Sequence, residues 1–204
     1  GTRSWRRALA VDQQLGDANK VGAEWSMRSL DVAKVGCLAL SGSCIANWRE
    51  RAHRAYWSGV ITPTLALSAE WRYESMRLNE DFSTTGGASN SLSVPLRTRT
   101  EQWPVRAWWH ITPEFSASFE ERRVRQDTVT LNTGAIETLG STHFWVSSAS
   151  IRQRLDNGNY WWELAVNNIF NQHFLYQDTN LAGDPRVPEF WPTRMLTVRL
   201  NGQW

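Results

Sequence analysis

The chain ends in a stretch in which apolar and polar side chains alternate up to the last residue. The apolar positions of this stretch, residues 193 to 204, are Leu196, Val198, Leu200, Gly202 and Trp204. Because successive side chains of a β-strand point to opposite sides, the pattern predicts a strand with one apolar and one polar face. Chain ends of soluble domains usually fray. An apolar last strand that ends in an aromatic residue is typical of outer-membrane β-barrels, whose aromatic residues form girdles at the membrane edges.

The same alternation recurs along the chain and predicts nine strands of about ten to fourteen residues each. Tight turns are predicted near residues 17, 63, 113 and 157, the last at an Asn-Gly pair that favours β-hairpins. Longer loops are predicted over residues 31–47, 79–98 and 178–192, and a short loop follows residue 131. Short turns therefore gather at one end of the structure and long loops at the other, an asymmetry that bacterial outer-membrane barrels show.

One hairpin is repeated at an offset of 50 residues. The repeat aligns Ile61-Thr62-Pro63 with Ile111-Thr112-Pro113, Ser68 with Ser118, Glu70 with Glu120, and Arg72 with Arg122. Agreement at six positions, in register with the alternation of the strands, indicates a repeated β-hairpin.

The composition fits a membrane barrel and disfavours several other classes. No stretch approaches about 18 consecutive apolar residues, so no transmembrane helix is expected. The 13 Trp residues favour a boundary between apolar and wet surroundings, as at a bilayer interface. The net charge of +2 lacks the basic excess of a nucleic-acid-binding protein. Cys37 and Cys44 close a short loop, so a disulfide is expected there, with two free thiols as the alternative and a metal site disfavoured because no His lies nearby.

These patterns predict an all-β fold, an antiparallel transmembrane β-barrel of meander topology. The last strand of such a barrel ends at the periplasmic side, so with nine strands the first strand also runs inward. Single-chain bacterial barrels begin with an outward strand and usually have an even number of strands. We therefore expect residues 1–204 to supply about nine C-terminal strands of a larger single barrel domain, with any plug or helical-repeat domain outside this sequence.

The face opposite the apolar one carries most of the charges, and in a barrel it would line the lumen. The predicted lumen-facing candidates are Arg54, Glu70, Arg72, Arg106, Trp108, His110, Glu120, Arg122, Arg152, Arg154, Trp161, Glu163 and Arg199. Charges directed into a dry protein core would be very costly unless they are paired. The charged face would guide an anionic solute or bind an inserted plug domain. The alternative is that these residues only pair across strands and hold a wet interior together.

No residue pattern nominates a catalytic or metal centre. The histidines, His53, His110, His143 and His173, lack ligand spacing with a Cys or carboxylate on a shared face. Glu120 and Glu121 lie on opposite faces of a strand and cannot act together. We expect no enzyme activity, no metal and no cofactor.

The end of the chain resembles TonB-dependent outer-membrane receptors. The family's penultimate strand typically reads apolar-x-V-x-N-Leu-Phe-Asp-x-x-Tyr, and a Pro-x-Arg opens its last strand. The residues of this chain that match are Val166, Asn168, Ile169, Phe170, Asn171, Pro192 and Arg194. The chain differs in having Ile169 for Leu, Asn171 for Asp, Phe174 for Tyr, and Trp204 for the commoner terminal Phe. The match covers about the last forty residues.

The resemblance implies a barrel of the outer membrane of a Gram-negative bacterium that takes up iron chelates, cobalamin or glycans. The implied partners are outer-membrane lipid and lipopolysaccharide, and TonB or another periplasmic protein that acts through an N-terminal region. Leu200, Gly202 and Trp204 resemble the C-terminal signal that the barrel-assembly machinery reads.

Two other functions remain open from the sequence. The first is a polysaccharide-export barrel or diffusion porin, since Trp108 and Trp161 on the polar face would stack on sugar rings. The second is a soluble, Trp-rich, carbohydrate-binding β-domain.

Overall fold

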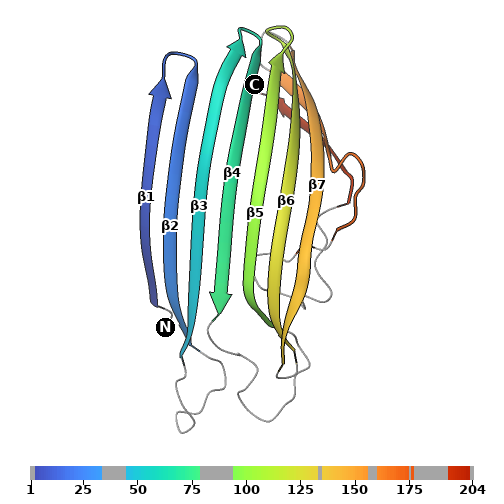
Figure 1. Ribbon diagram of the computed structural model, residues 1–204. Helices are drawn as coiled ribbons and strands as arrows, with labels where there is room; N and C mark the ends of the chain where they lie inside the picture. Colours follow the sequence, from blue (N-terminus) through green and yellow to red (C-terminus); the bar gives the residue numbers. More distant parts are fainter. Residues whose placement is uncertain are drawn as a thin grey trace.

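The computed structural model describes residues 3–33, 45–78, 94–132, 135–155, 160–174, 176 and 193–202. These residues form nine β-strands in one sheet (Figure 1). The strands are β1 (Arg3–Leu15), β2 (Asn19–Ala33), β3 (Ile45–Thr62), β4 (Leu65–Leu78), β5 (Val94–His110), β6 (Phe115–Asn132), β7 (Ala135–Leu155), β8 (Tyr160–Asn167) and β9 (Met195–Gly202). The described part of the chain contains no helix long and apolar enough to span a membrane.

The sheet is an antiparallel meander, in which each strand pairs with its neighbours in sequence, in the order β1 to β9. This confirms the predicted all-β class, the nine strands and the meander topology. The sheet is open among the described residues, because β1 pairs only with β2 and β9 only with β8. A closed barrel is therefore not formed by these strands alone.

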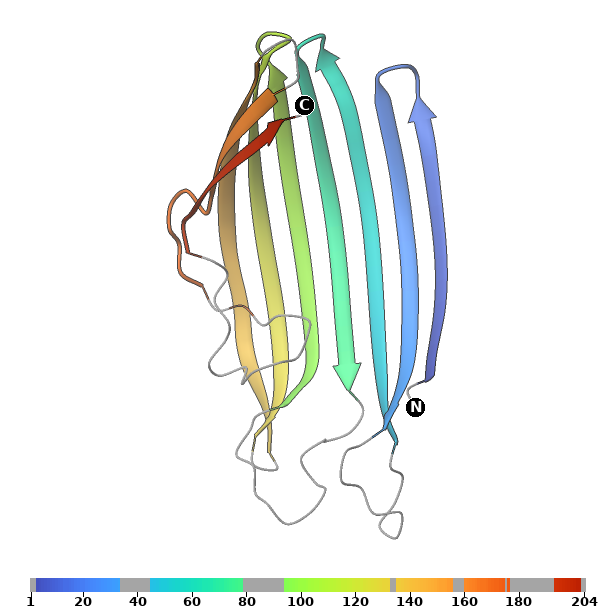
Figure 2. The same cartoon turned by 180° about the vertical axis from the view of Figure 1, so that it is seen from behind.

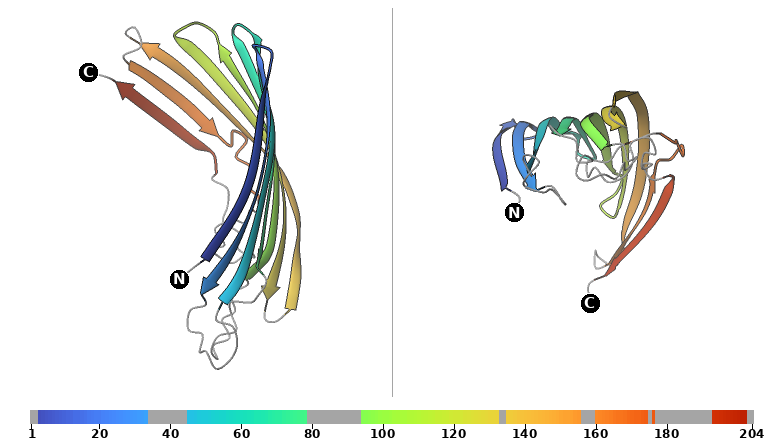
Figure 3. Two further views of the ribbon diagram at one scale, coloured as in Figure 1. Left: turned by 90° about the vertical axis from the view of Figure 1, so that its left-hand side faces the viewer. Right: turned by 90° about the horizontal axis from the view of Figure 1, so that it is seen from below.

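The sheet is strongly curved, and β8 and β9 bend away from the long strands (Figures 2 and 3). The register keeps the predicted polar residues on one face, since Glu24 lies opposite Arg54 and Arg106 opposite Glu120. That face is the concave one, because one hollow on it is lined both by Arg106 of β5 and by Arg199 of β9. Side chains of strands that are not neighbours thus line one hollow on the concave face.

Several strands have lengths that the sequence pattern did not predict. Five of the strands run 15 to 21 residues, whereas β8 and β9 have only 8 each. Residues 94–98, predicted as loop, belong to β5, and residues 31–33 and 45–47 belong to β2 and β3. The loop prediction was wrong for 94–98 because it continued the polar composition of residues 79–93, although the β-branched Val94 and Thr98 suit a strand.

A small apolar core lies on the otherwise polar concave face. Val124, Phe144 and Val146 are buried there, and Phe174 and Tyr176 pack against them. The rings of Phe144 and Phe174 stack with their centroids 3.6 Å apart. The chain after β8 therefore leaves the sheet and covers part of its concave face.

The convex face exposes large apolar side chains from the first strand to the last. Leu9 is 66% exposed, Trp109 53% and Val198 62%. Trp57 and Leu67 are partly exposed on the same face. Among the described residues no second layer packs on this face, since all nine strands belong to one sheet and the buried apolar cluster lies on the opposite side.

Candidate functional site

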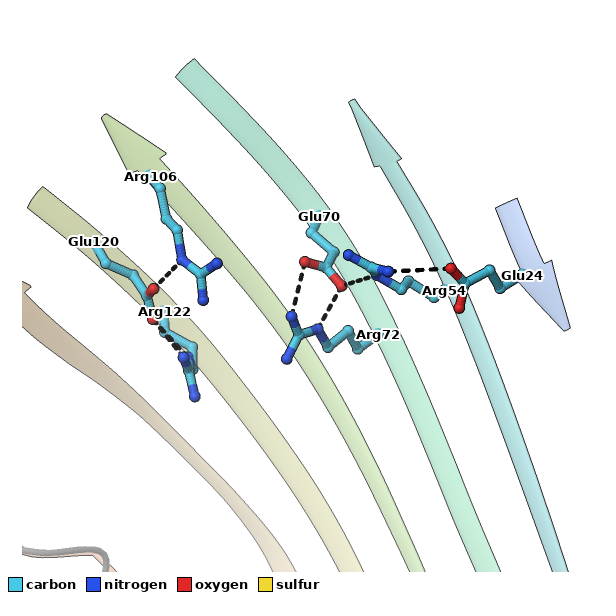
Figure 4. A network of polar contacts seen from close by, with 7 residues as sticks. All are labelled: Glu24, Arg54, Glu70, Arg72, Arg106, Glu120 and Arg122. Carbon is cyan, nitrogen blue, oxygen red and sulfur yellow. Dashed lines mark hydrogen bonds and ion pairs between the residues drawn. The ribbon is translucent and has the colours of Figure 1, made fainter. Parts of the chain in front are cut away.

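A row of ion pairs crosses the middle of the concave face. Glu70 of β4 accepts hydrogen bonds from two arginines, Arg54 of β3 and Arg72 of its own strand (Figure 4). The Arg72 contact is bidentate, with Nε–Oε1 at 2.5 Å and Nη2–Oε2 at 2.9 Å. Arg54 also donates through Nη1 to Glu24 of β2, at 3.1 Å. The side chain of Glu70 is only 8% exposed, so its charge depends on these guanidinium groups.

The repeated hairpin builds a second group of the same kind. Glu120 of β6 accepts hydrogen bonds from Arg106 of β5 and from Arg122 of its own strand. The Glu-x-Arg pair thus recurs at the offset of 50 residues, whereas the second arginine does not. Arg106 lies directly opposite Glu120, but the residue directly opposite Glu70 is Tyr56, and Arg54 reaches Glu70 from two positions away.

The turns of the two hairpins share the same pair of hydrogen bonds to a threonine hydroxyl. The Thr62 hydroxyl accepts the backbone N–H groups of Thr64 at 3.3 Å and Leu65 at 3.0 Å. The Thr112 hydroxyl accepts those of Glu114 at 3.3 Å and Phe115 at 3.0 Å. A Thr before Pro thus forms the same side-chain turn twice. The repeat read from the sequence therefore corresponds to a repeated local structure.

The remaining predicted residues lie on the same concave face, and some of them share a hollow with Arg106 and Glu120. The register places Arg152 opposite Glu163 and Arg154 opposite Trp161. The guanidinium of Arg152 lies 4.1 Å from the centroid of the Trp161 ring, and Arg199 contacts Glu163 at 3.4 Å. Trp108 lines one hollow together with Glu163 and Arg199, and His110 ends β5. No ring contact joins Trp108 to Trp161 in the part of the chain that the structure describes.

Further pairs on this face were not singled out from the sequence. Arg28 holds Glu50 with two hydrogen bonds of 2.7 Å. Asp12 accepts a hydrogen bond from the Tyr56 hydroxyl and contacts Lys20 at 3.4 Å. The sequence places these residues on the polar face, but the register that makes them partners was needed to find the pairs.

The motif near the end of β8 forms a tight turn. Asn168 and Asn171 both have a φ of 51°, the left-handed region that Asn tolerates better than most residues. The Asn168 side chain accepts the N–H of Gln172 and donates to its carbonyl, both at 2.9 Å. The amide oxygen of Asn171 accepts the backbone N–H of Arg194 at 2.9 Å. This turn ends β8 and positions the start of β9.

The other predicted features are partly outside the described residues. Cys37, Cys44, the Asn157-Gly158 turn, Pro192 and Trp204 lie outside them. Of the predicted assembly signal, Leu200 is 80% exposed on the convex face, and Gly202 lies opposite Tyr160. A Cβ on Gly202 would lie 2.7 Å from the Tyr160 ring, so only glycine fits beneath it.

Two chemical possibilities find no support in the described residues. They hold no group of three or more His, Cys, Asp or Glu side chains that could bind a metal ion. The carboxylates Glu120 and Glu121 point to opposite faces, as expected, because Glu120 meets arginines while Glu121 accepts a hydrogen bond from Ser147 at 2.5 Å. What the site offers is a row of fixed, paired charges on a concave wall.

The chain matches no protein-family pattern and no curated protein.

Proposed function

We propose that this chain forms part of the wall of an outer-membrane transport barrel, with its convex face against lipid and its concave face against a water-filled lumen. The observation that carries the proposal is the exposure of large apolar side chains on the convex face, in strands from β1 to β9. Burying apolar surface is worth about 25 cal/mol per Å². A face of this size would therefore drive aggregation in water unless another phase covers it.

The concave face supports the same arrangement from the other side. It carries Arg–Glu groups whose arginines stay about one-third exposed, as in Arg54 and Arg72. Such groups suit a wet interior, because a dry core would leave their remaining donors unsatisfied. The strand lengths are also sufficient, since about ten tilted residues cross the hydrocarbon core and β2 to β7 have 14 to 21.

The free edges of the sheet support a larger barrel. All 13 residues of β1 are exposed, and one edge of the strand has no partner among the described residues. In a membrane every backbone N–H and C=O must be satisfied within the protein, so an open edge cannot face lipid. We therefore propose that further strands close the wall between β1 and β9.

The receptor type of barrel is the function we favour, with an iron chelate, cobalamin or a glycan as the solute. Support comes from the sequence motif at Asn168–Asn171 and from its structural role in placing β9. The proposed partners are outer-membrane lipid and lipopolysaccharide, the barrel-assembly machinery, and TonB or another periplasmic protein. None of these involves nucleic acid.

A polysaccharide-export barrel or diffusion porin is the second candidate. It is favoured by aromatic rings on the wet face, since Trp108 is 37% exposed there and Trp161 stacks with Arg152. Such rings bind the faces of sugars through their apolar surface. If this candidate is right, replacing both Trp residues by Ala should reduce glycan transport. If the protein is a receptor for another solute, the same variant should transport that solute as the unchanged protein does.

The proposal is tested by labelling two neighbouring residues of β4 that point to opposite faces. Ser68→Cys and Ala69→Cys are made in a protein in which Cys37 and Cys44 are Ser. In intact outer membranes a hydrophilic maleimide should label Ser68→Cys and spare Ala69→Cys, which reacts only after denaturation. Equal labelling of both, or recovery of the protein in the soluble fraction, would instead support the soluble carbohydrate-binding domain.

A further inference from the structure

A recess of about 480 Å³ lies on the concave face toward the long-loop end of the sheet. It spans β1 to β5, and its lining includes Arg6, Arg28, Glu50, Glu74, Met76 and Thr98. Its floor is a cross-strand row in which Ser26 lies opposite Ala52, and Ala52 opposite Glu74. Small side chains in that row leave the floor lower than the charged rows on either side. The recess is thus built by the register of these strands.

Glu74 is an unpaired charge in this recess. Among the described residues no cation forms an ion pair with its carboxylate, although arginines lie in both adjoining rows. Arg28 is held by Glu50, and both Arg54 and Arg72 by Glu70, whereas Arg6 lies across the recess on β1, three strands from Glu74. The pairing of its neighbours therefore leaves Glu74 as a fixed negative charge open to the recess.

Thr98 provides the second unsatisfied group. It is 3% exposed, and its hydroxyl oxygen is buried without a hydrogen-bond partner. The nearby hydroxyl of Thr100 accepts a hydrogen bond from the Gln126 amide at 3.0 Å. A buried polar group without a partner costs about 1–3 kcal/mol, so its presence calls for an explanation. A ligand that enters the recess and donates to Thr98 would supply the missing hydrogen bond.

We propose that this recess binds an amine-bearing solute through its ammonium group. The ammonium donates to the Glu74 carboxylate, and a second polar group of the solute bonds to the Thr98 hydroxyl. The apolar side chain of Met76 contacts the carbon skeleton between them. The inference deepens the proposed function and rests on it for one point, that the recess faces the outer mouth of the lumen.

An ammonium fits better than the other charged groups that a solute can carry. A bare metal ion takes six or more oxygen ligands or a cluster of His, Cys and carboxylates, and the described residues hold no such cluster. An anion would be repelled by Glu74, Arg28 is already engaged by Glu50 on two nitrogen atoms, and Arg6 lies on β1, three strands from Glu74. On the β4 and β5 side of the recess the unsatisfied groups are thus the charged carboxylate of Glu74 and the hydroxyl of Thr98.

The test measures binding of 2-aminoethanol to the full protein, purified in detergent, by saturation-transfer NMR titration. Ethylene glycol is the neutral probe of similar size, and Mg²⁺ is the inorganic cation. Glu74→Gln removes the charge and keeps the shape, Thr98→Val removes the hydroxyl and keeps the shape, and Glu114→Gln changes the net charge equally in a distant turn. We expect Glu74→Gln to weaken 2-aminoethanol binding about tenfold or more, because it removes a charge-assisted hydrogen bond.

Thr98→Val should weaken the same binding roughly threefold to tenfold, since the hydrogen bond it removes is a neutral one. Glu114→Gln should bind as the unchanged protein does. Equal loss in Glu114→Gln, unchanged binding in Glu74→Gln, equal binding of ethylene glycol, or competition by Mg²⁺ at equal concentration would each overturn the inference. Because this assay needs no membrane or transport, its failure is distinct from failure of the labelling test of the barrel.

Discussion

The amide oxygen of Asn171 accepts a hydrogen bond from the backbone N–H of Arg194, at 2.9 Å. This bond joins the turn after β8 to the residue just before β9. Asn171 also donates its own N–H to the carbonyl of Asn168 at 2.8 Å. The start of the last strand is therefore set by one side chain of the turn, in addition to the ladder of hydrogen bonds between β8 and β9.

The role of Asn171 predicts a graded series of variants. Asn171→Asp keeps an acceptor oxygen and tolerates the left-handed φ, so the free energy of unfolding should change by less than about 0.5 kcal/mol. Asn171→Gly relieves the backbone but loses the bond, which costs about 1 kcal/mol. Asn171→Ala loses both and costs about 2 kcal/mol. Urea unfolding of the protein refolded in lipid measures the series, and equal stability of the Ala and Asp variants would contradict it.

The stability of the sheet should depend strongly on the charge of Glu70, in the middle of the concave face. Glu70→Gln leaves Arg54 and Arg72 facing each other directly across β3 and β4 without the carboxylate between them. We expect a loss of about 2 kcal/mol in the free energy of unfolding, partly restored by high salt, which screens the two arginines. The double variant Glu70→Gln/Arg72→Gln should be more stable than Glu70→Gln alone. If the double variant is the less stable one, repulsion between the arginines is not the cause.

The strands and their faces could be predicted from the sequence, because alternation with a period of two is a local property of the chain. The repeat from Ile61 to Arg72 was equally visible, since both copies keep Thr-Pro at the turn and Glu-x-Arg on the following strand. The pairing partners could not be predicted from the repeat alone. Arg54 and Arg106 occupy different positions relative to their glutamates, and only the register shows that both reach them.

The recess and the small core could not be predicted from the alternation of apolar and polar residues, and the reason is a different one. Thr98 carries little hydrophobic signal, so its stretch was predicted as loop, although Thr98 is buried in the structure. Phe144 and Phe174 are 30 residues apart and meet only because the chain turns back at Asn168. Such contacts depend on tertiary structure, whereas alternation reports only which face of a strand a residue occupies.

The two threonine turns predict matched effects in the two hairpins. Thr62→Ala and Thr112→Ala each remove an acceptor for two backbone N–H groups, and each should cost about 1 kcal/mol in the free energy of unfolding. Thr62→Ser and Thr112→Ser keep the oxygen and should be close to neutral. Thr64→Ala is the control, because the Thr64 hydroxyl contacts only the Thr62 hydroxyl, at 3.3 Å. Unequal losses in the two hairpins, measured by urea unfolding, would show that the turns are not equivalent.

A pair of adjacent residues in β9 separates the membrane interpretation from the soluble one. Val198 is 62% exposed on the convex face, and Thr197 points to the concave face opposite Ala165. If lipid covers the convex face, Val198→Arg costs about 2–4 kcal/mol, because a charge at that depth must leave water. Thr197→Arg adds the same charge to a wet face and should cost less than about 1 kcal/mol. In a soluble domain Val198 already contacts water, so both variants should be nearly neutral. The measurement is the free energy of unfolding in lipid, together with the yield of folded protein in outer membranes, and a Val198→Arg protein as stable and abundant as Thr197→Arg would remove the basis for placing this face against lipid.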